Sequence, residues 1–174
     1  MEDTHSHHLG LFFDEDWNRH DSEQSFGHDI EASWLLMKTA LVLGDKDIVD
    51  NALVHTRNIA EAALQGRCVD GSMVYERYGN GHYCNDKHWW VQAECVIGQI
   101  YLYRFHGIEN AAMMAVQTWD YIKRNIVDYD GGEWFWSRNA DGSVNRTDDK
   151  AGFWKCPYHN SRMCLEVYSI LGEM

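Results

Sequence analysis

Two helices with almost no polar face constrain the fold of this chain more than any other feature. The first extends from about residue 26 to Gly44 and the second from about Lys87 to Phe105. A helix that is apolar all round is normally buried on every side. Helices of about 45–65 and 109–127 follow them, and each has a single apolar stripe, which predicts one wet face. A shorter helix at about 161–171 follows a third loop, so buried and half-exposed helices alternate along the chain.

This alternation defines three units of roughly sixty to seventy residues, each with a turn-rich loop, a buried helix and an amphipathic helix, the last unit being cut short. One helical hairpin cannot bury its own apolar face, so such repeats stack into a solenoid or close into a ring. Inner helices without a wet side and outer helices with one predict an all-α half ring, or toroid, with short β-hairpin loops at its mouth. The Asn80-Gly81 pair between two aromatic runs predicts one of these hairpins. At 174 residues, the chain is expected to form one domain.

The composition limits which binding partners and which cellular compartment are expected for this chain. The net charge of −12 argues against nucleic acid and anionic membranes. The sequence has neither an apolar run long enough to span a bilayer nor a charged-then-apolar leader. Five cysteines, odd in number and without C-x-x-C spacing, predict a reduced, cytoplasmic protein in which Cys156 and Cys164 are small core residues. His5, His7 and His8 have no further ligands at a recognisable spacing, so a solvated lead-in is predicted there instead of a metal site.

The loops that lead into the buried helices contain polar and charged side chains, which are costly to bury unless they have a partner or serve a functional site. His28 and Glu31 are three apart and project from one helix face, although a satisfied core histidine is the alternative on this stretch alone. Equivalent loops lie at the same end of a ring, so their side chains are expected to converge on one mouth. The residues concerned are His28, Glu31, His88, Trp89, Trp90, Glu94, Trp154 and His159.

Three segments resemble the cellobiose 2-epimerases, within the broader N-acylglucosamine 2-epimerase group. They are SFGHDIEASWLL at 25–36, KHWWVQAE at 87–94 and GFWKCPYHNSRMCLE at 152–166. The resemblance extends from LFFDEDWN at 11–18 to the end of the chain. Members of this family are closed (α/α)6 barrels, so residues 1–174 resemble only the C-terminal half of such a barrel. The family's N-terminal half supplies other pocket residues, including an arginine at the sugar.

The resemblance implies an epimerase that needs no cofactor or metal and interconverts glucose and mannose at the reducing end of a β-1,4-linked disaccharide. Ring opening exposes an aldehyde, a base removes the C2 proton, and an acid returns a proton to the opposite face. The family's two essential histidines match His28 and His159, which suit proton transfer near neutral pH. Glu31 is expected to hydrogen-bond His28 and raise its basicity. The sugar-binding residues implied are Trp34, Trp89 or Trp90, Trp154 and Glu94.

Several alternatives remain on the sequence alone. Trp34 is also typical of core packing, and at most one of the adjacent residues Trp89 and Trp90 is expected to face sugar. The substrate could instead be N-acylglucosamine or mannose. A glycoside hydrolase would use paired carboxylates, such as Glu31 or Asp29 with Glu94, and a non-catalytic sugar-binding half barrel would keep the aromatic mouth without the chemistry. The isolated chain is expected to be inactive, and to self-associate or require the missing half.

Overall fold

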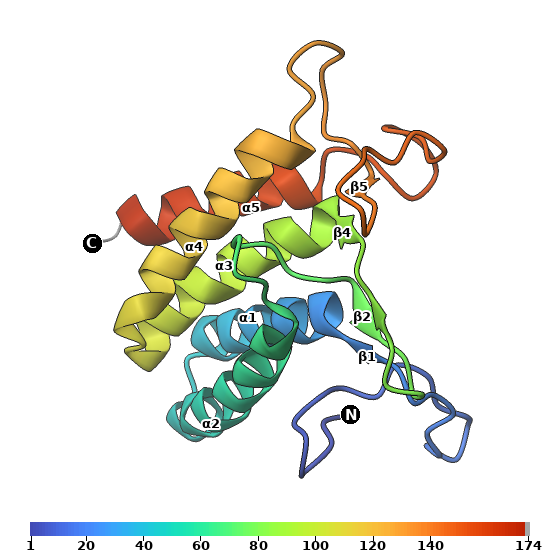
Figure 1. The fold of residues 1–174 in the computed structure, drawn as a ribbon. Coiled ribbons are helices and arrows are strands. Elements are labelled where there is room, and N and C mark those ends of the chain that lie inside the picture. Colours follow the sequence, from blue (N-terminus) through green and yellow to red (C-terminus); the bar gives the residue numbers. More distant parts are fainter. Residues whose placement is uncertain (173–174) are drawn as a thin grey trace.

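The computed structural model describes residues 1–172 and consists mainly of helices (Figure 1). In chain order the elements are β1 (Gln24–Ser25), α1 (Phe26–Leu43), α2 (Lys46–Ala63), a 3-10 turn (Leu64–Gly66), β2 (Glu76–Arg77), β3 (Tyr83–Cys84), β4 (Lys87–His88), α3 (Trp89–His106), α4 (Glu109–Tyr121), a π-helical turn (Ile122–Ile126), β5 (Ser137–Arg138) and α5 (His159–Gly172). The all-α class and the predicted helices are confirmed, with ends that differ from the prediction by a few residues. Gly44 ends α1 in the left-handed conformation, with φ 69°.

The helices alternate between an inner and an outer row. α3 packs between α1 and α5, while α2 covers α1 and α4 covers α3 (Figure 1). Every residue of α3 from Val91 to Leu102 is buried, as its continuous apolar sequence predicts. The close fit of α1 to α3 depends on Gly98, where an added Cβ would lie 2.4 Å from the side chain of Ile30. The central inner helix is therefore enclosed by its own chain from Val91 to Leu102.

The inner helices at the two edges are not enclosed, which differs from the prediction that α1 is buried all round. On α1, Leu36 is 49% exposed and Val42 is 79% exposed. On α5, Leu165 is 70% exposed and Tyr168 is 80% exposed. These side chains lie on helix faces that no further helix covers within residues 1–172. α1 thus has the apolar pattern of an inner helix, although part of its apolar surface is exposed in the described part of the chain.

Short strands hold the loops of successive units together. β1, which leads into α1, pairs with β2 of the next unit, and β2 forms a hairpin with β3 around the predicted turn. In the same way β4, which leads into α3, pairs with β5 of the third unit. All five strands lie at one end of the helices (Figure 1). The loops that lead into α1, α3 and α5 are thereby brought together, as the repeat predicts.

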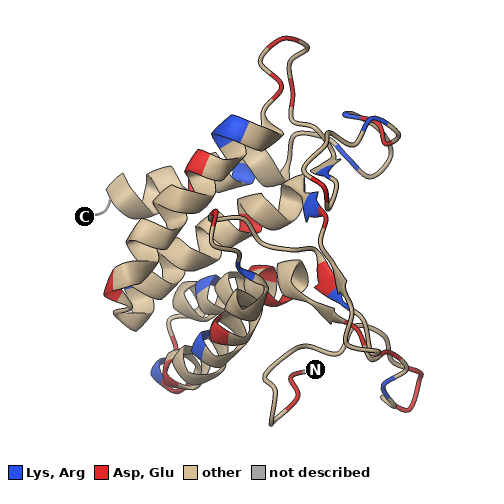
Figure 2. Ribbon diagram, viewed as in Figure 1, with Lys and Arg blue, Asp and Glu red and all other residues tan. Residues whose placement is uncertain are grey.

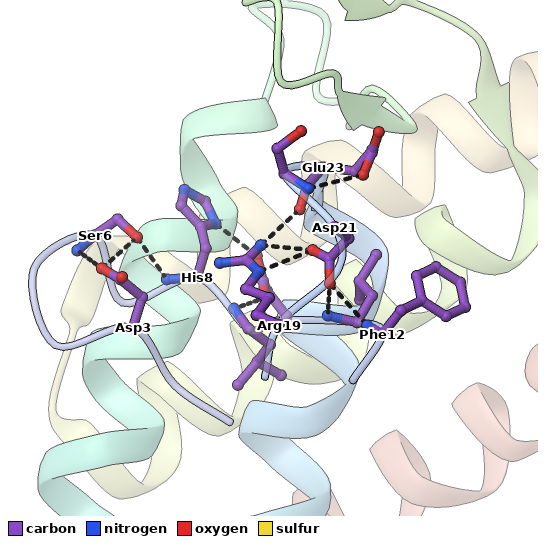
Figure 3. Close-up of polar contacts among 11 residues, drawn as sticks. Asp3, Ser6, His8, Phe12, Arg19, Asp21 and Glu23 are labelled. Carbon is purple, nitrogen blue, oxygen red and sulfur yellow. Dashed lines mark hydrogen bonds and ion pairs between the residues drawn. The ribbon is translucent and has the colours of Figure 1, made fainter. Parts of the chain in front are cut away.

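The N-terminal segment is built differently from the predicted solvated lead-in. His8 is buried, and its Nδ1 lies 2.6 Å from a carboxylate oxygen of Asp29 in the first turn of α1. The Asp21 carboxylate accepts backbone N–H bonds from Leu11 and Phe12 and pairs with Arg19, so the segment folds around its own carboxylates (Figure 3). The segment before β1 is therefore a fixed strap across the start of α1.

Charged residues are few on the central inner helix and frequent on α2 and in the loops. α3 has only Glu94 and Arg104 as Lys, Arg, Asp or Glu residues, and most charges lie on α2 and the loops (Figure 2). Among residues 1–172, no helix combines the length and the hydropathy needed to cross a bilayer. All five cysteines are free, but Cys156 and Cys164 are exposed, so the prediction that they are core residues was wrong.

Candidate functional site

The strand-bearing end of the helices contains a cavity of about 430 Å³. Nine side chains line it, and they come from all three units: His28, Glu31, Tyr75, Trp89, Trp90, Trp136, Trp154, Tyr158 and His159. The structure therefore brings both sequence-predicted histidines into one space of a size suited to a small ligand. Of the predicted residues, Trp34, His88 and Glu94 do not line this cavity. His88 instead stacks on Tyr75, with the ring centroids 4.0 Å apart.

His159 begins α5 and is held from behind by Glu94. Its Nδ1 lies 2.5 Å from Glu94 Oε1, and Glu94 itself is fully buried. A carboxylate can only accept, so the imidazole donates from Nδ1 to Glu94 and its Nε2 is the nitrogen left for a ligand. Arg162, one helical turn further along α5, donates to the same Glu94 oxygen at 2.7 Å and also to Glu31. The buried charge of Glu94 is thereby compensated from two sides.

Trp34 has a supporting position that the sequence did not predict. It is 2% exposed, and its Nε1 donates to Glu94 Oε2 at 2.8 Å. The guanidinium of Arg162 lies over its ring, 5.1 Å from the centroid. The expected sugar contact of Trp34 is therefore replaced by a contact that orients Glu94 and Arg162. Glu94 likewise acts on His159 and Arg162 instead of reaching the cavity.

His28 does not have the partner that the sequence predicted. Its Nδ1 lies 2.7 Å from Ser25 Oγ, at the residue before α1, while Glu31 pairs with Arg162. The predicted hydrogen bond between Glu31 and His28 is therefore wrong. The charge of Glu31 nevertheless raises the pKa of His28. Within residues 1–172, neither His28 nor His159 has a hydrogen-bond partner at Nε2.

The two histidines are separated by one aromatic ring. The Trp90 centroid lies 4.9 Å from that of His28 and 5.6 Å from that of His159. This contact requires Gly27, because a Cβ there would lie 2.5 Å from the Trp90 ring. The glycine before His28 thus allows α3 to approach the first turn of α1. Trp90 forms the floor between the two imidazoles.

Burial among these rings lowers the pKa of His28, and the carboxylates of Glu31 and Asp29 oppose this effect. His28 is therefore expected to titrate below its ordinary value of 6.5 and to be neutral at pH 7. Changing Glu31 to Gln should lower this pKa further, since the largest favourable interaction of the imidazolium is lost. NMR titration of the His28 ring in both proteins measures the two values. A higher His28 pKa in the Glu31→Gln variant would show that Glu31 does not act on His28 through its charge.

The aromatic walls are only partly those predicted. Trp90 and the 76% exposed Trp154 line the cavity, and Trp89 reaches it with 1% of its surface exposed. Tyr75, Trp136 and Tyr158 also line the cavity and were not predicted. A signal for two of them exists in the repeat. Met73-Val74-Tyr75-Glu76-Arg77 aligns with Trp134-Phe135-Trp136-Ser137-Arg138, and both segments pair with the strand before an inner helix.

Glu31, Glu94 and His159 offer ligand atoms within 4.8 Å of one another, a spacing that can also suit a metal ion. Arg162 donates to both carboxylates, so a fixed guanidinium supplies positive charge at this point. His159 directs its Nδ1 to Glu94, as an oriented imidazole does. The cluster is thus internally compensated and is suited to proton transfer.

Changing Arg162 to Met should lower the free energy of unfolding by about 1.5–3 kcal/mol, because the buried Glu94 loses a charged donor while keeping His159 and Trp34. Urea unfolding at one protein concentration measures the loss. The matched control is Arg57→Met, which removes an exposed pair with Glu61 and should cost less than about 1 kcal/mol. Equal losses in the two variants would mean that Glu94 does not depend on Arg162.

Comparison with known proteins shows which sequences and structures this chain resembles. A sequence model of the N-acylglucosamine 2-epimerase (GlcNAc 2-epimerase) family matches residues 1–162. The cellobiose 2-epimerase of Bacteroides fragilis is 51% identical over 172 residues, which cover 98% of this chain and 43% of that protein. The cellobiose 2-epimerase of Ruminococcus albus is 40% identical over 164 residues, covering 91% of this chain and 41% of that protein.

The structure of cellobiose 2-epimerase from Spirochaeta thermophila superposes with a TM-score of 0.88 at 36% identity, covering 95% of this chain and 42% of that one. The predicted fold, half of an (α/α)6 barrel, is confirmed by this likeness and by the alternating helices. The chain spans less than half the length of the relatives that it matches.

Proposed function

The chain belongs to the N-acylglucosamine 2-epimerase family, and from that premise we propose that it is the histidine-bearing half of a sugar 2-epimerase acting on cellobiose and related β-1,4-linked disaccharides. The observation that carries the proposal is the cavity in which His28 and His159 flank Trp90. The substrate is an oligosaccharide whose reducing-end glucose is converted to mannose. The similarity to cellobiose 2-epimerases favours this substrate over N-acylglucosamine and free mannose.

Epimerisation at C2 needs two proton carriers on opposite sides of one carbon. After ring opening, the aldehyde acidifies the C2 proton, and a neutral imidazole removes it to give an enediolate. The second histidine, in its protonated imidazolium form, gives a proton to the other face of C2. Because the reaction is reversible, each histidine is the base for one epimer and the acid for the other.

Each histidine has a residue that keeps its ring in place for this task. Glu94 holds His159 through Nδ1, and Ser25 holds His28 through Nδ1, which leaves both Nε2 atoms for substrate. Burial keeps the pKa of His28 low, so this imidazole is neutral and able to accept a proton at pH 7. Trp90, Trp136 and Trp154 offer flat apolar faces to the C–H surfaces of pyranose rings.

The alternative of a glycoside hydrolase finds less support in the geometry. A hydrolase needs two carboxyl groups that both reach the sugar. Asp29 is fully buried and bonded to His8, and Glu94 is fully buried and bonded to His159. Glu31 is then the one carboxylate of the three that lines the cavity. A pair of histidines reaches the ligand space more directly than any pair of these carboxylates.

The test is a chimera in which residues 1–174 replace the matching C-terminal part of the Bacteroides fragilis cellobiose 2-epimerase. Incubated with cellobiose in heavy water, the chimera should form the mannose-ended epimer and incorporate deuterium at C2. Sugar analysis and mass spectrometry measure both. Release of free glucose would instead indicate a hydrolase. Tight binding of cellobiose without any product would indicate a non-catalytic sugar-binding half barrel.

A further inference from the structure

Lys155 is the least expected buried residue of the site. Its side chain is completely buried, although lysine is rarely buried without a partner. The ammonium donates to the backbone oxygens of Lys150 and Trp134 at 2.7 and 2.9 Å and to Glu133 Oε1 at 3.0 Å. All three of its N–H donors are therefore used. A lysine so completely bonded is a structural connector, not a free nucleophile.

The ammonium of Lys155 is connected to His159 by two chains of contacts. It lies over the Trp89 ring, 4.5 Å from the centroid, and the Trp89 centroid is in turn 5.3 Å from that of His159. Its partner Glu133 also accepts a hydrogen bond from Asn160, the residue after His159. Glu133 has φ 61°, a left-handed conformation that is uncommon for residues other than glycine. The surrounding bonds of Glu133 hold it in that conformation.

Lys155 also closes the turn that presents Trp154 to the cavity. Gly152 and Lys155 exchange backbone hydrogen bonds of 2.8 and 3.2 Å, so Phe153 and Trp154 form the tip of a tight turn. Both tip residues are exposed, and their rings meet edge to face at 4.9 Å. The buried Lys155 is thus the point at which an otherwise exposed turn is fastened to the helices.

We propose that Lys155 is a positioning residue, which holds the His159 imidazole through Trp89 and through Glu133–Asn160 and fixes the Trp154 turn to the same support. Its ammonium contacts the Trp89 ring, which packs against His159, and its backbone closes the turn that carries Trp154. The catalytic consequence rests on the proposed epimerase function, whereas the geometric claim can be tested without any substrate.

The chain offers a matched control on the same turn. Lys150 pairs with Asp128 and donates to the backbone oxygen of Gly132, and its ammonium lies near Phe135. It therefore anchors the same segment without touching Trp89 or Glu133. Changing Lys150 to Met should loosen the turn and leave His159 in place. Changing Lys155 to Met should affect both.

The experiment is hydrogen–deuterium exchange of the 174-residue chain, read by mass spectrometry at the backbone amides and at the C2 position of each histidine ring. Lys155→Met should raise the exchange rate of the His159 ring severalfold, because the ring loses its support and becomes more accessible. His8, buried in the N-terminal strap, is the internal control and should keep its rate. Backbone amides of residues 150–156 should exchange faster in both Lys155→Met and Lys150→Met.

An unchanged His159 rate in Lys155→Met would overturn the proposal, as would an equal rise in Lys150→Met. If Lys155→Met does not fold, Glu133→Gln removes the paired charge and keeps a neutral acceptor. It should then raise the His159 rate in the same direction, and an unchanged rate in that variant would overturn the proposal. In the chimera, Lys155→Met should also lower kcat for cellobiose. If the parental chimera shows no epimerisation, the proposed function fails while the exchange result still decides the role of Lys155.

Discussion

Replacing His159 with alanine in the chimera should reduce cellobiose epimerisation by about 10²–10⁴-fold, which is the usual contribution of a positioned general acid–base group. His159 lines the cavity and is oriented by a fully buried carboxylate, so the substitution removes one of the two proposed proton carriers. Disaccharide binding should be largely retained, because binding is spread over several aromatic faces while proton transfer acts in the transition state. Deuterium incorporation at C2 measures the step directly.

The control for this variant is His55→Ala. His55 lies on the outer helix α2, where it is exposed and pairs with Glu2, far from the cavity-lining residues. It removes a histidine without touching the proposed chemistry, so the rate should stay at the parental level. If His159→Ala exchanged the C2 proton at the parental rate, the proton carrier would have to be another residue. Loss of binding together with activity would mean that His159 serves the fold instead of the chemistry.

The sequence predicts the fold well because periodicity is a local property. Continuous apolar residues in α3 and a single stripe in α2 are enough to separate inner from outer helices. The repeat then places His28 and His159 at the same end, since equivalent loops occupy equivalent positions. The cavity that both histidines line agrees with this expectation. Their catalytic roles remain a proposal.

The sequence alone did not predict which side chains of the site pair with one another. The sequence predicts that Glu31 pairs with His28, three residues away. In the structure Glu31 pairs with Arg162, which is 131 positions further along the chain. Trp34 likewise bonds to Glu94, at a separation of 60 residues. Such partners depend on how the three inner helices lie side by side. No periodicity within one helix contains that information.

Arg162 is a site residue that the sequence analysis did not name. The family resemblance implies a sugar-contacting arginine from the family's N-terminal half, whereas Arg162 of this chain already reaches two carboxylates of the site. Its position three residues after His159 places it on the same helix face, a spacing that would have indicated it. His8 is a harder case, because its buried contact with Asp29 depends on a strap without regular structure.

The exposed edges of α1 and α5 lead to the second large expected effect. Leu36 and Val42 at one edge and Leu165 and Tyr168 at the other are apolar side chains with about half or more of their surface in water. Burying one such side chain completely contributes roughly 1.5–3 kcal/mol. Covering both edges would therefore contribute an amount comparable with the whole stability of a domain, about 5–15 kcal/mol.

The isolated chain of 174 residues is therefore expected to self-associate and to show no epimerisation. Apolar edges of this extent favour contact with any complementary surface, and the ring remains open without further helical hairpins. The relatives that it matches are more than twice as long, which is consistent with a second half that covers the same edges. Light scattering across a concentration series measures the mass, and the cellobiose assay measures the activity of the same sample.

Charged substitutions identify which surface is responsible. Leu165→Lys combined with Tyr168→Lys places two charges on the open face of α5, where both side chains are already exposed, so the fold should be kept while the mass falls toward that of a monomer. The matched control is Met113→Lys on the outer helix α4, where the side chain is 61% exposed but lies away from both edges. It should leave the mass unchanged. A parental chain that is monomeric at all concentrations and converts cellobiose would contradict this prediction, since three inner helices would then suffice for both fold and chemistry.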